Sequence, residues 1–204
     1  MRAPSGLRLA PGRLDQAAQA RLLADVLAVI EAAPLYTPRM PRTGAPMSVQ
    51  MTNCGALGWL TDQAHGYRYT PAHPETGRPW PPIPQLLLDL WDEFAAYRAP
   101  PEACLVNVYR DGARMGLHVD SDEAARDAPV VSISLGDAAI FRVGGLRRSD
   151  PTTSLRLSSG DVVVLADEAR ASYHGIDRVL GGSRGLVPGG GRINLTLRRV
   201  TIPQ

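Results

Sequence analysis

Apolar residues recur at helical spacing in two segments of the first half of the chain. Asp15 is a suitable N-cap for a helix that runs to about Ala33, and Pro34 follows its end. Pro84 opens a second helix as a first-turn proline, and this helix ends before Pro100. The apolar stripes consist of Leu22, Val26, Val29 and Ile30 in the first helix and of Leu87, Leu90, Trp91 and Phe94 in the second. The first helix is therefore expected to cover a sheet.

After residue 101 the pattern changes to short apolar runs separated by turn signals. The predicted strands are Cys104–Tyr109, Gly116–Asp120, Val130–Leu135, Ala139–Val143, Ser154–Leu157, Asp161–Leu165 and Arg192–Val200, and Met47–Asn53 is a further candidate earlier in the chain. A Gly-rich loop from Gly181 to Gly191 precedes the last strand. Many short strands at this spacing predict a mainly β fold, an antiparallel sandwich or barrel.

The segment from residue 34 to residue 83 is rich in proline, glycine and aromatic residues and has little regular periodicity. Long irregular segments in compact domains are usually lids or binding loops. Trp59, Tyr67 and Tyr69 are either core residues or a stacking platform for a nucleobase, with Arg68 placed to meet a phosphate. Spacing alone favours the core.

Two predicted strands carry polar residues on one face only. In 104–109, Cys104, Val106 and Val108 share one face, whereas Leu105, Asn107 and Tyr109 share the other. In 192–198, Ile193, Leu195 and Leu197 share one face, whereas Arg192, Asn194, Thr196 and Arg198 share the other. A solvent-exposed polar face is the common explanation of such a pattern. If the polar faces line a barrel interior instead, the two arginines there require an anion, which a dicarboxylate would provide.

The triplet His118-Val119-Asp120 places an imidazole and a carboxylate on the same face of an extended segment. The chain has four histidines, and His174, in Tyr173-His174-Gly175, is the candidate third ligand. Two histidines and one carboxylate form the facial triad of non-haem Fe(II) oxygenases. By itself the triplet is equally compatible with a surface strand whose His and Asp form hydrogen bonds. The two cysteines, Cys54 and Cys104, form no C-x-x-C motif and do not suggest a zinc or redox site.

Length and charge restrict the function only weakly. A chain of 204 residues is expected to form one domain, alone or with an extension. The net charge is +2 and all 22 basic residues are arginine, for which codon bias is the favoured explanation and phosphate binding the alternative. No window reaches the roughly 18 apolar residues of a membrane span. Residues 1–14 look irregular and lack the apolar core of a signal peptide. A cytoplasmic monomer with no membrane contact is expected.

From residue 45 to residue 200 the chain resembles the AlkB family, the Fe(II)- and 2-oxoglutarate-dependent dioxygenases that dealkylate nucleic-acid bases. The most specific matching stretches are Thr52-Asn53-Cys54-Gly55 with Leu57-Gly58-Trp59, Cys104–Tyr109, His118-Val119-Asp120 with Asp122-Glu123, Val131–Gly136, Ala139-Ile140-Phe141 with Gly144-Gly145-Leu146, Gly160–Val164, Tyr173–Ile176 and Arg192–Arg198. The resemblance implies a double-stranded β-helix (jelly roll) with N-terminal helices and a nucleotide-recognition lid. It divides one compact unit into residues 1–100, with the helices and the lid, and residues 101–204, the catalytic core.

The resemblance also assigns roles to residues. It implies that Fe(II) is bound by His118, Asp120 and His174, and that 2-oxoglutarate is held by Asn107, Tyr109, Arg192, Asn194 and Arg198, with O₂ as the second cosubstrate. It implies that Trp59 stacks on a flipped, damaged base and that Asp122 and Arg148 lie near this base. It implies that Tyr67, Arg68 and Tyr69 grip the DNA backbone and shape the lid. The expected partner is alkylated single-stranded DNA, with duplex DNA and RNA as alternatives. The resemblance therefore reverses the preference for Trp59 as a core residue.

Two features depart from the family pattern. Leu165 stands where a member of the family has a tryptophan, and the spacing from Trp59 to Tyr67 is longer by one residue. Two other functions remain open at this point. A 2-oxoglutarate-dependent hydroxylase of a protein or a small molecule would keep the iron and cosubstrate residues but would not need the aromatic segment or Asp122. A jelly-roll binding module would need neither set.

Overall fold

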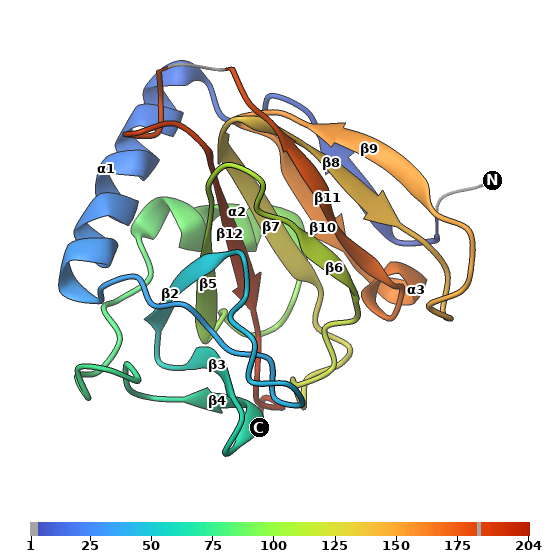
Figure 1. Ribbon diagram of the computed structural model, residues 1–204. Coiled ribbons are helices and arrows are strands. Elements are labelled where there is room, and N and C mark those ends of the chain that lie inside the picture. Colours follow the sequence, from blue (N-terminus) through green and yellow to red (C-terminus); the bar gives the residue numbers. More distant parts are fainter. Residues whose placement is uncertain (1–3, 183–184) are drawn as a thin grey trace.

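Two antiparallel sheets packed face to face form the body of the molecule, as the strand pattern predicted (Figure 1). The computed structural model describes residues 4–182 and 185–204. The six-stranded sheet has the order β1 (Leu7–Ala10), β10 (Val162–Leu165), β7 (Val130–Gly136), β12 (Arg192–Arg198), β5 (Ala103–Tyr109) and β2 (Gln50–Gly55). The four-stranded sheet has the order β6 (Met115–His118), β11 (His174–Leu180), β8 (Ala138–Val143) and β9 (Thr153–Leu157). The predicted mainly β fold is thus confirmed.

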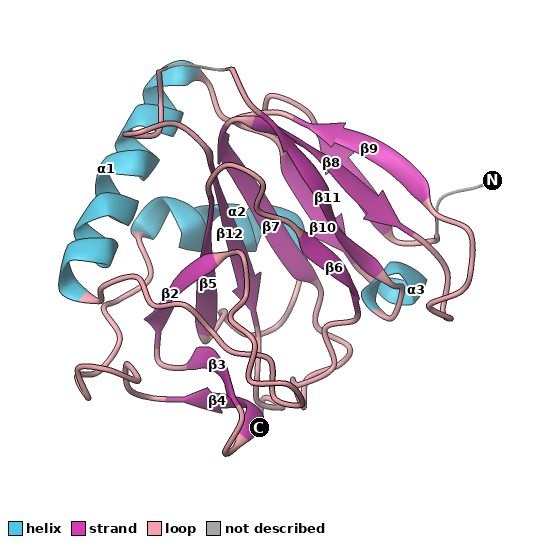
Figure 2. Cartoon of the chain, viewed as in Figure 1, coloured by secondary structure: helices cyan, strands magenta, loops and turns pink. Residues whose placement is uncertain are grey.

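Helices cover the outer face of the six-stranded sheet (Figure 2). Helix α1 (Gln16–Ala32) begins where predicted, because the side chain of Asp15 accepts a 2.7 Å hydrogen bond from the backbone N–H of Ala18. Helix α2 (Gln85–Ala95) also forms, but Pro84 occupies its N-cap and not its first turn, since the backbone at Pro84 is still extended (ψ 140°). A third, short helix, α3 (Asp167–Arg170), was not predicted.

The central strands of the six-stranded sheet are buried on both faces, which creates two cores. On the outer face, Leu22, Val26, Leu87 and Trp91 of the helices pack against Val106, Ile133 and Leu195. Between the sheets, Leu105, Tyr109, Val163 and Leu165 meet Phe141, Val143 and Ile176. Every residue of β5 and β12 is buried. The polar faces of these strands therefore line the barrel interior, and the solvent-exposed alternative is wrong.

A separate hairpin, β3 (Gly58–Asp62) with β4 (Gly66–Thr70), lies beside the open end of the two sheets (Figure 1). The sequence predicted this segment as irregular. The prediction that residues 1–14 are irregular is also wrong, because Leu7–Ala10 forms the edge strand β1 on β10. The strand β11, which starts at His174, was not predicted either. Residues 183 and 184 of the predicted Gly-rich loop lie outside the described residues.

Several predicted boundaries shift by one to three residues. Strand β2 starts at Gln50 and not at Met47, β6 ends at His118 and not at Asp120, and β12 ends at Arg198. The pairing of β2 with β5 joins segments on both sides of residue 100 in one sheet. Among the helices of the described residues, none is long and apolar enough to cross a membrane.

Candidate active site

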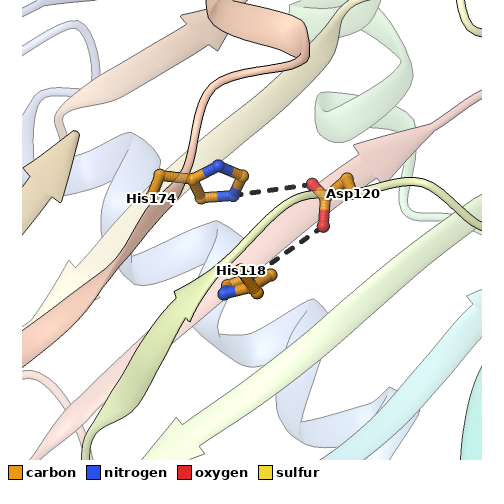
Figure 3. A group of neighbouring side chains, drawn as sticks. All are labelled: His118, Asp120 and His174. Atoms are coloured by element: carbon orange, nitrogen blue, oxygen red, sulfur yellow. Dashed lines mark ion pairs between the residues drawn. The ribbon is translucent and has the colours of Figure 1, made fainter. Parts of the chain in front are cut away.

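His118, Asp120 and His174 meet between the two sheets at one end of the barrel (Figure 3). His118 is the last residue of β6 and His174 the first of β11, and the two are directly paired across the strands. Their ring centroids lie 4.6 Å apart. The Nε2 atom of each histidine is 3.7 Å from an oxygen of Asp120. All three potential ligand atoms lie within 4.8 Å of one another, so a single metal ion can contact them together.

Gly175 allows β6 and β11 to approach closely enough for this pairing. A Cβ atom at Gly175 would lie 2.5 Å from the carbonyl oxygen of Met115 and 2.8 Å from that of Gly116. Such distances are far shorter than a van der Waals contact, so only glycine fits here without a shift of β6. The close approach therefore controls the distance between the two imidazoles.

Backbone carbonyls orient both imidazole rings. The Nδ1 atom of His118 lies 2.9 Å from the carbonyl oxygen of Gly116, and that of His174 lies 3.0 Å from the carbonyl oxygen of Ser172. Because a carbonyl only accepts, each Nδ1 carries the hydrogen and each Nε2 presents its lone pair toward Asp120. Burial lowers the pKa of His174 to about 4, so this ring is neutral at physiological pH and suited to bind a metal ion.

The carboxylate of Asp120 is held in its charged form. Burial alone would raise its pKa, but the charge of Arg198, with smaller contributions from His174 and His118, places the pKa well below the usual range. Arg198 donates a 2.8 Å hydrogen bond to Oδ1, whereas Oδ2 is buried and has no hydrogen-bond partner within the described part of the chain. Two imidazole nitrogens and an anionic oxygen without a hydrogen-bond partner fit a divalent metal ion such as Fe(II).

An inner pocket extends from this triad between the two sheets, over the inward faces of β5 and β12. Its lining includes all five residues predicted to hold the cosubstrate, namely Asn107, Tyr109, Arg192, Asn194 and Arg198. The register brings them together, because Arg192 pairs with Tyr109 and Asn194 pairs with Asn107 across the two strands. Leu165 also lines this pocket, with 3% of its surface exposed.

Arg192 lines this pocket and forms no ion pair with another of the described residues. Its side chain is fully buried, and it donates a 2.8 Å hydrogen bond to Ser134 Oγ. Its Nε and Nη1 atoms, together with Asn107 Oδ1, have no hydrogen-bond partner among the described residues. Burial lowers the pKa of Arg192 to about 10, so the group stays cationic at neutral pH. A buried guanidinium with two unsatisfied nitrogen donors fits the carboxylate of a ligand.

An outer pocket of about 290 Å³ opens on the other side of the metal ligands. His118, Asp120 and Arg198 are shared by both pockets. Trp59 and Tyr67 stand in the outer wall with their rings stacked, 5.6 Å between centroids and 23° between planes.

Two charged side chains complete this outer wall. Trp59 Nε1 donates a 2.7 Å hydrogen bond to Asp122 Oδ2. Asp122 and Arg148 are both exposed and line the pocket. The wall therefore presents aromatic faces, a carboxylate and a guanidinium in one space.

Two predicted substrate residues lie outside this lining. Arg68 is turned back along its own hairpin and forms an ion pair with Asp62, with an N–O distance of 2.6 Å. The hydroxyl of Tyr69 donates to Glu123 and accepts a 3.3 Å hydrogen bond from Arg198. Of the tripeptide 67–69, the structure therefore brings only Tyr67 into the outer pocket.

Comparison with known proteins agrees with this geometry. The family model of the 2OG-Fe(II) oxygenase superfamily matches residues 6–198. The chain is 60% identical over 194 residues to a Caulobacter vibrioides protein named Alpha-ketoglutarate-dependent dioxygenase AlkB homolog, covering 95% of this chain and 87% of that protein. The chain belongs to the AlkB family of 2-oxoglutarate- and Fe(II)-dependent oxygenases. The predicted family is thus confirmed, and Fe(II), 2-oxoglutarate and O₂ are the requirements of this family.

Two further matches support the same conclusion for fold and family. The structure of OsALKBH1 aligns with a TM-score of 0.76 at 28% identity and covers 98% of this chain and 99% of that chain. An Arabidopsis thaliana protein named DNA N(6)-methyladenine demethylase ALKBH1A is 42% identical over 106 residues, which is 49% of this chain and 31% of that protein. The AlkB-family chain described here is therefore an enzyme with a jelly-roll core.

The sequence did not reveal several residues that shape the site of this AlkB-family enzyme. Four methionines line the outer pocket, namely Met40, Met47, Met51 and Met115. Glu123 and Arg170 form a buried ion pair behind the triad, 2.8 Å between Nη2 and Oε2. The sequence does not show that these methionines line a pocket, because an apolar residue in an irregular segment is as compatible with the core as with a pocket wall. The sequence analysis did single out Asp122-Glu123, but it did not identify Arg170 in α3 as the partner of Glu123.

Proposed function

We propose that this enzyme removes methyl groups oxidatively from N1-methyladenine and N3-methylcytosine in nucleic acid, with single-stranded DNA as the main substrate. The observation that carries the proposal is the juxtaposition of the outer pocket and the triad. One set of residues, His118, Asp120 and Arg198, borders both the inner pocket, which contains the guanidinium of Arg192, and the outer pocket with its aromatic wall. A base held in the outer pocket would therefore have its substituent next to the metal ligands.

The chemistry of the outer wall suits a cationic, planar ring. Methylation at N1 of adenine or N3 of cytosine blocks the pairing edge and leaves the ring positively charged, and such a base leaves a duplex easily or is already unpaired. Stacking on Trp59 or Tyr67 would bind the ring face, and the exposed carboxylate of Asp122 would attract its charge. Arg148 lines the same pocket and suits a neighbouring phosphate.

The protein's own contribution is to hold the reactants and their charges. Arg192 provides unsatisfied donors for a dicarboxylate, and His118, Asp120 and His174 provide three ligands on one side of a metal ion. When bound, the iron, with 2-oxoglutarate and O₂, supplies the oxidation that converts the N-methyl group to a hydroxymethyl group, with succinate and CO₂ as coproducts. The hydroxymethyl group then leaves as formaldehyde, which restores the base.

The test is a demethylation assay with single-stranded oligonucleotides that contain N1-methyladenine or N3-methylcytosine. Fe(II), 2-oxoglutarate and air are supplied, and formaldehyde, succinate and the restored base are measured together. Matched duplex DNA and RNA oligonucleotides, which differ from single-stranded DNA in pairing and at the 2′-hydroxyl, determine the preferred polymer. The variant Asp120→Ala is the inactive control, because a site with two ligands binds Fe(II) poorly.

Each outcome of this assay has a clear meaning. Equimolar succinate, formaldehyde and restored base support the proposal. Succinate formed with a protein or a metabolite, but with no methylated oligonucleotide, would replace it with the hydroxylase alternative. Normal formaldehyde release by Asp120→Ala would show that the metal is held elsewhere.

A further inference from the structure

We infer that Arg170 is a positioning residue for the metal centre, which fixes the loop that carries Asp120 relative to the segment that carries His174. Asp120 lies in the loop of residues 119–129, between β6 and β7, which has no helix or strand of its own. A ligand on such a loop needs a separate constraint to hold its position. Arg170 stands at the end of α3, four residues before His174, and its side chain is 7% exposed.

The guanidinium of Arg170 contacts that loop at three separate points. Nη1 donates to the backbone carbonyl of Asp120 itself. Nη2 donates to Glu123 Oε2 at 2.8 Å, and Nε donates to the backbone carbonyl of Ala128 at 3.1 Å. The planar guanidinium spaces its donors rigidly, so one side chain holds the beginning, middle and end of the loop in a single geometry. A lysine has one donor nitrogen and cannot make these three contacts together.

Glu123 extends this constraint to the rest of the site. Its side chain is 1% exposed, and its other oxygen, Oε1, accepts from the hydroxyl of Tyr69 on β4. The same oxygen lies 3.6 Å from Nε of Arg198, the residue that donates to Asp120 Oδ1. Asp120 is thus held from two sides, at its backbone by Arg170 and at its carboxylate by Arg198, and both arginines meet at Glu123.

A purely structural role would have a different consequence from a positioning role. A buried ion pair such as Arg170–Glu123 often contributes little net stability, because desolvation of both charges offsets their attraction. Replacing both partners with methionine would remove the pair but keep apolar volume, and the fold can then persist. The metal ligand would nevertheless lose its backbone anchor. Metal affinity, and not stability, is therefore the quantity that reports the positioning role.

The test measures Co(II) binding to the metal-free full-length protein, followed by visible absorption, alongside its thermal unfolding. Arg170→Lys is expected to raise the Kd for Co(II) about 10- to 100-fold, the usual effect of losing a residue that orients a metal ligand. Arg178→Lys is the matched control, because Arg178 follows His174 by four residues but has a side chain that is 64% exposed. Its Kd is expected to equal that of the unchanged protein.

The double variant Arg170→Met/Glu123→Met keeps the inference testable if Arg170→Lys does not fold. A folded double variant with weakened Co(II) binding supports the positioning role. A folded variant of either kind that binds Co(II) with unchanged Kd would overturn it. The inference rests on the metal site of the proposed function and not on its substrate. Because no nucleic acid enters this experiment, its failure is distinct from a failure of the demethylation assay.

Discussion

Trp59 Nε1 and Asp122 Oδ2 are joined by a 2.7 Å hydrogen bond that connects the β3–β4 hairpin with the loop of residues 119–129, which carries Asp120. This bond fixes the edge of the indole, while one ring face stacks on Tyr67. The two chain segments that border the outer pocket are thereby held at a defined separation. Asp122 consequently has two separable properties, an acceptor for the indole and a negative charge beside the pocket.

The variant Asp122→Asn separates these properties, because the amide oxygen still accepts the indole N–H but the charge is lost. We expect kcat/KM for N1-methyladenine, a cationic base, to fall about five- to tenfold, the scale of an ion pair that is partly exposed to water. The kcat/KM for N3-methylthymine, which is neutral, should change little. Steady-state kinetics on the two oligonucleotides provides the measurement.

Asp127→Asn is the matched control for this experiment. Asp127 is an exposed carboxylate in the same loop and accepts a 3.0 Å hydrogen bond from the hydroxyl of Tyr97, away from the pocket. Its substitution should leave both lesions unaffected. An equal loss on cationic and neutral lesions in Asp122→Asn would mean that Asp122 acts through the hairpin and not through its charge.

Loss of the aromatic ring of Trp59, which stacks on Tyr67, should weaken substrate binding but leave the conversion of 2-oxoglutarate intact. Trp59→Leu removes the larger aromatic face, and stacking of one base on an aromatic ring contributes about 1–3 kcal/mol. We expect kcat/KM for a methylated oligonucleotide to fall roughly 10- to 100-fold, whereas the slow conversion of 2-oxoglutarate without oligonucleotide stays constant. Succinate release, measured with and without DNA, distinguishes the two.

Trp59→Phe provides the complementary variant, since it keeps an aromatic face but loses the hydrogen bond to Asp122. A milder loss than in Trp59→Leu is expected. If the slow conversion of 2-oxoglutarate without DNA falls in both variants, Trp59 supports the barrel end itself and the stacking role is wrong.

Alternation along single strands predicted which side chains of the inner pocket share a face. Asn107 and Tyr109 on β5, and Arg192, Asn194 and Arg198 on β12, share a face because side chains in a strand repeat with a period of two. The apolar residues that alternate with them along each strand mark the opposite face. What the sequence did not determine was whether the polar face met solvent or a second sheet, since that depends on how the two sheets stack.

The outer pocket was less predictable, because hairpin geometry decides it. Tyr67-Arg68-Tyr69 was expected to act as one unit, yet adjacent residues of a strand point to opposite faces. Tyr69 pairs directly with Trp59, while Tyr67 is its diagonal neighbour and makes the stacking contact. The register of β3 with β4 therefore determines which of the two tyrosines stacks on Trp59. A single sequence does not reveal the register between two segments that look irregular.

Substitution of Arg192 should weaken the binding of 2-oxoglutarate. Arg192→Met keeps much of the buried volume but removes the two unsatisfied nitrogen donors. A hydrogen bond to a charged group contributes about 1.5–3 kcal/mol, so the KM for 2-oxoglutarate should rise roughly 10- to 100-fold. Ser134→Ala, which removes only the existing partner of Arg192, should have a much smaller effect. An unchanged KM in Arg192→Met would exclude Arg192 from the cosubstrate site.

Substitution of Gly175 should lower the metal affinity through a shift of the backbone, without changing any metal ligand. In Gly175→Ala the new Cβ would lie 2.5 Å from the carbonyl oxygen of Met115, so β6 must move away from β11. Because His118 is on β6 and His174 on β11, the two imidazoles separate, and we expect the Kd for Co(II) to rise about tenfold or more. Overpacking of this kind also lowers the free energy of unfolding by about 1–3 kcal/mol.

Gly116→Ala is the control that isolates this backbone effect. Gly116 lies on β6 as well, two residues before His118, but a Cβ there would meet no atom within 4 Å. It should leave both the Kd for Co(II) and the thermal midpoint near those of the unchanged protein. If Gly175→Ala lowers the midpoint but leaves the Kd unchanged, the close approach of the strands supports only the fold. If the Kd rises in Gly175→Ala alone, the distance between β6 and β11 determines how well the two histidines share a metal ion.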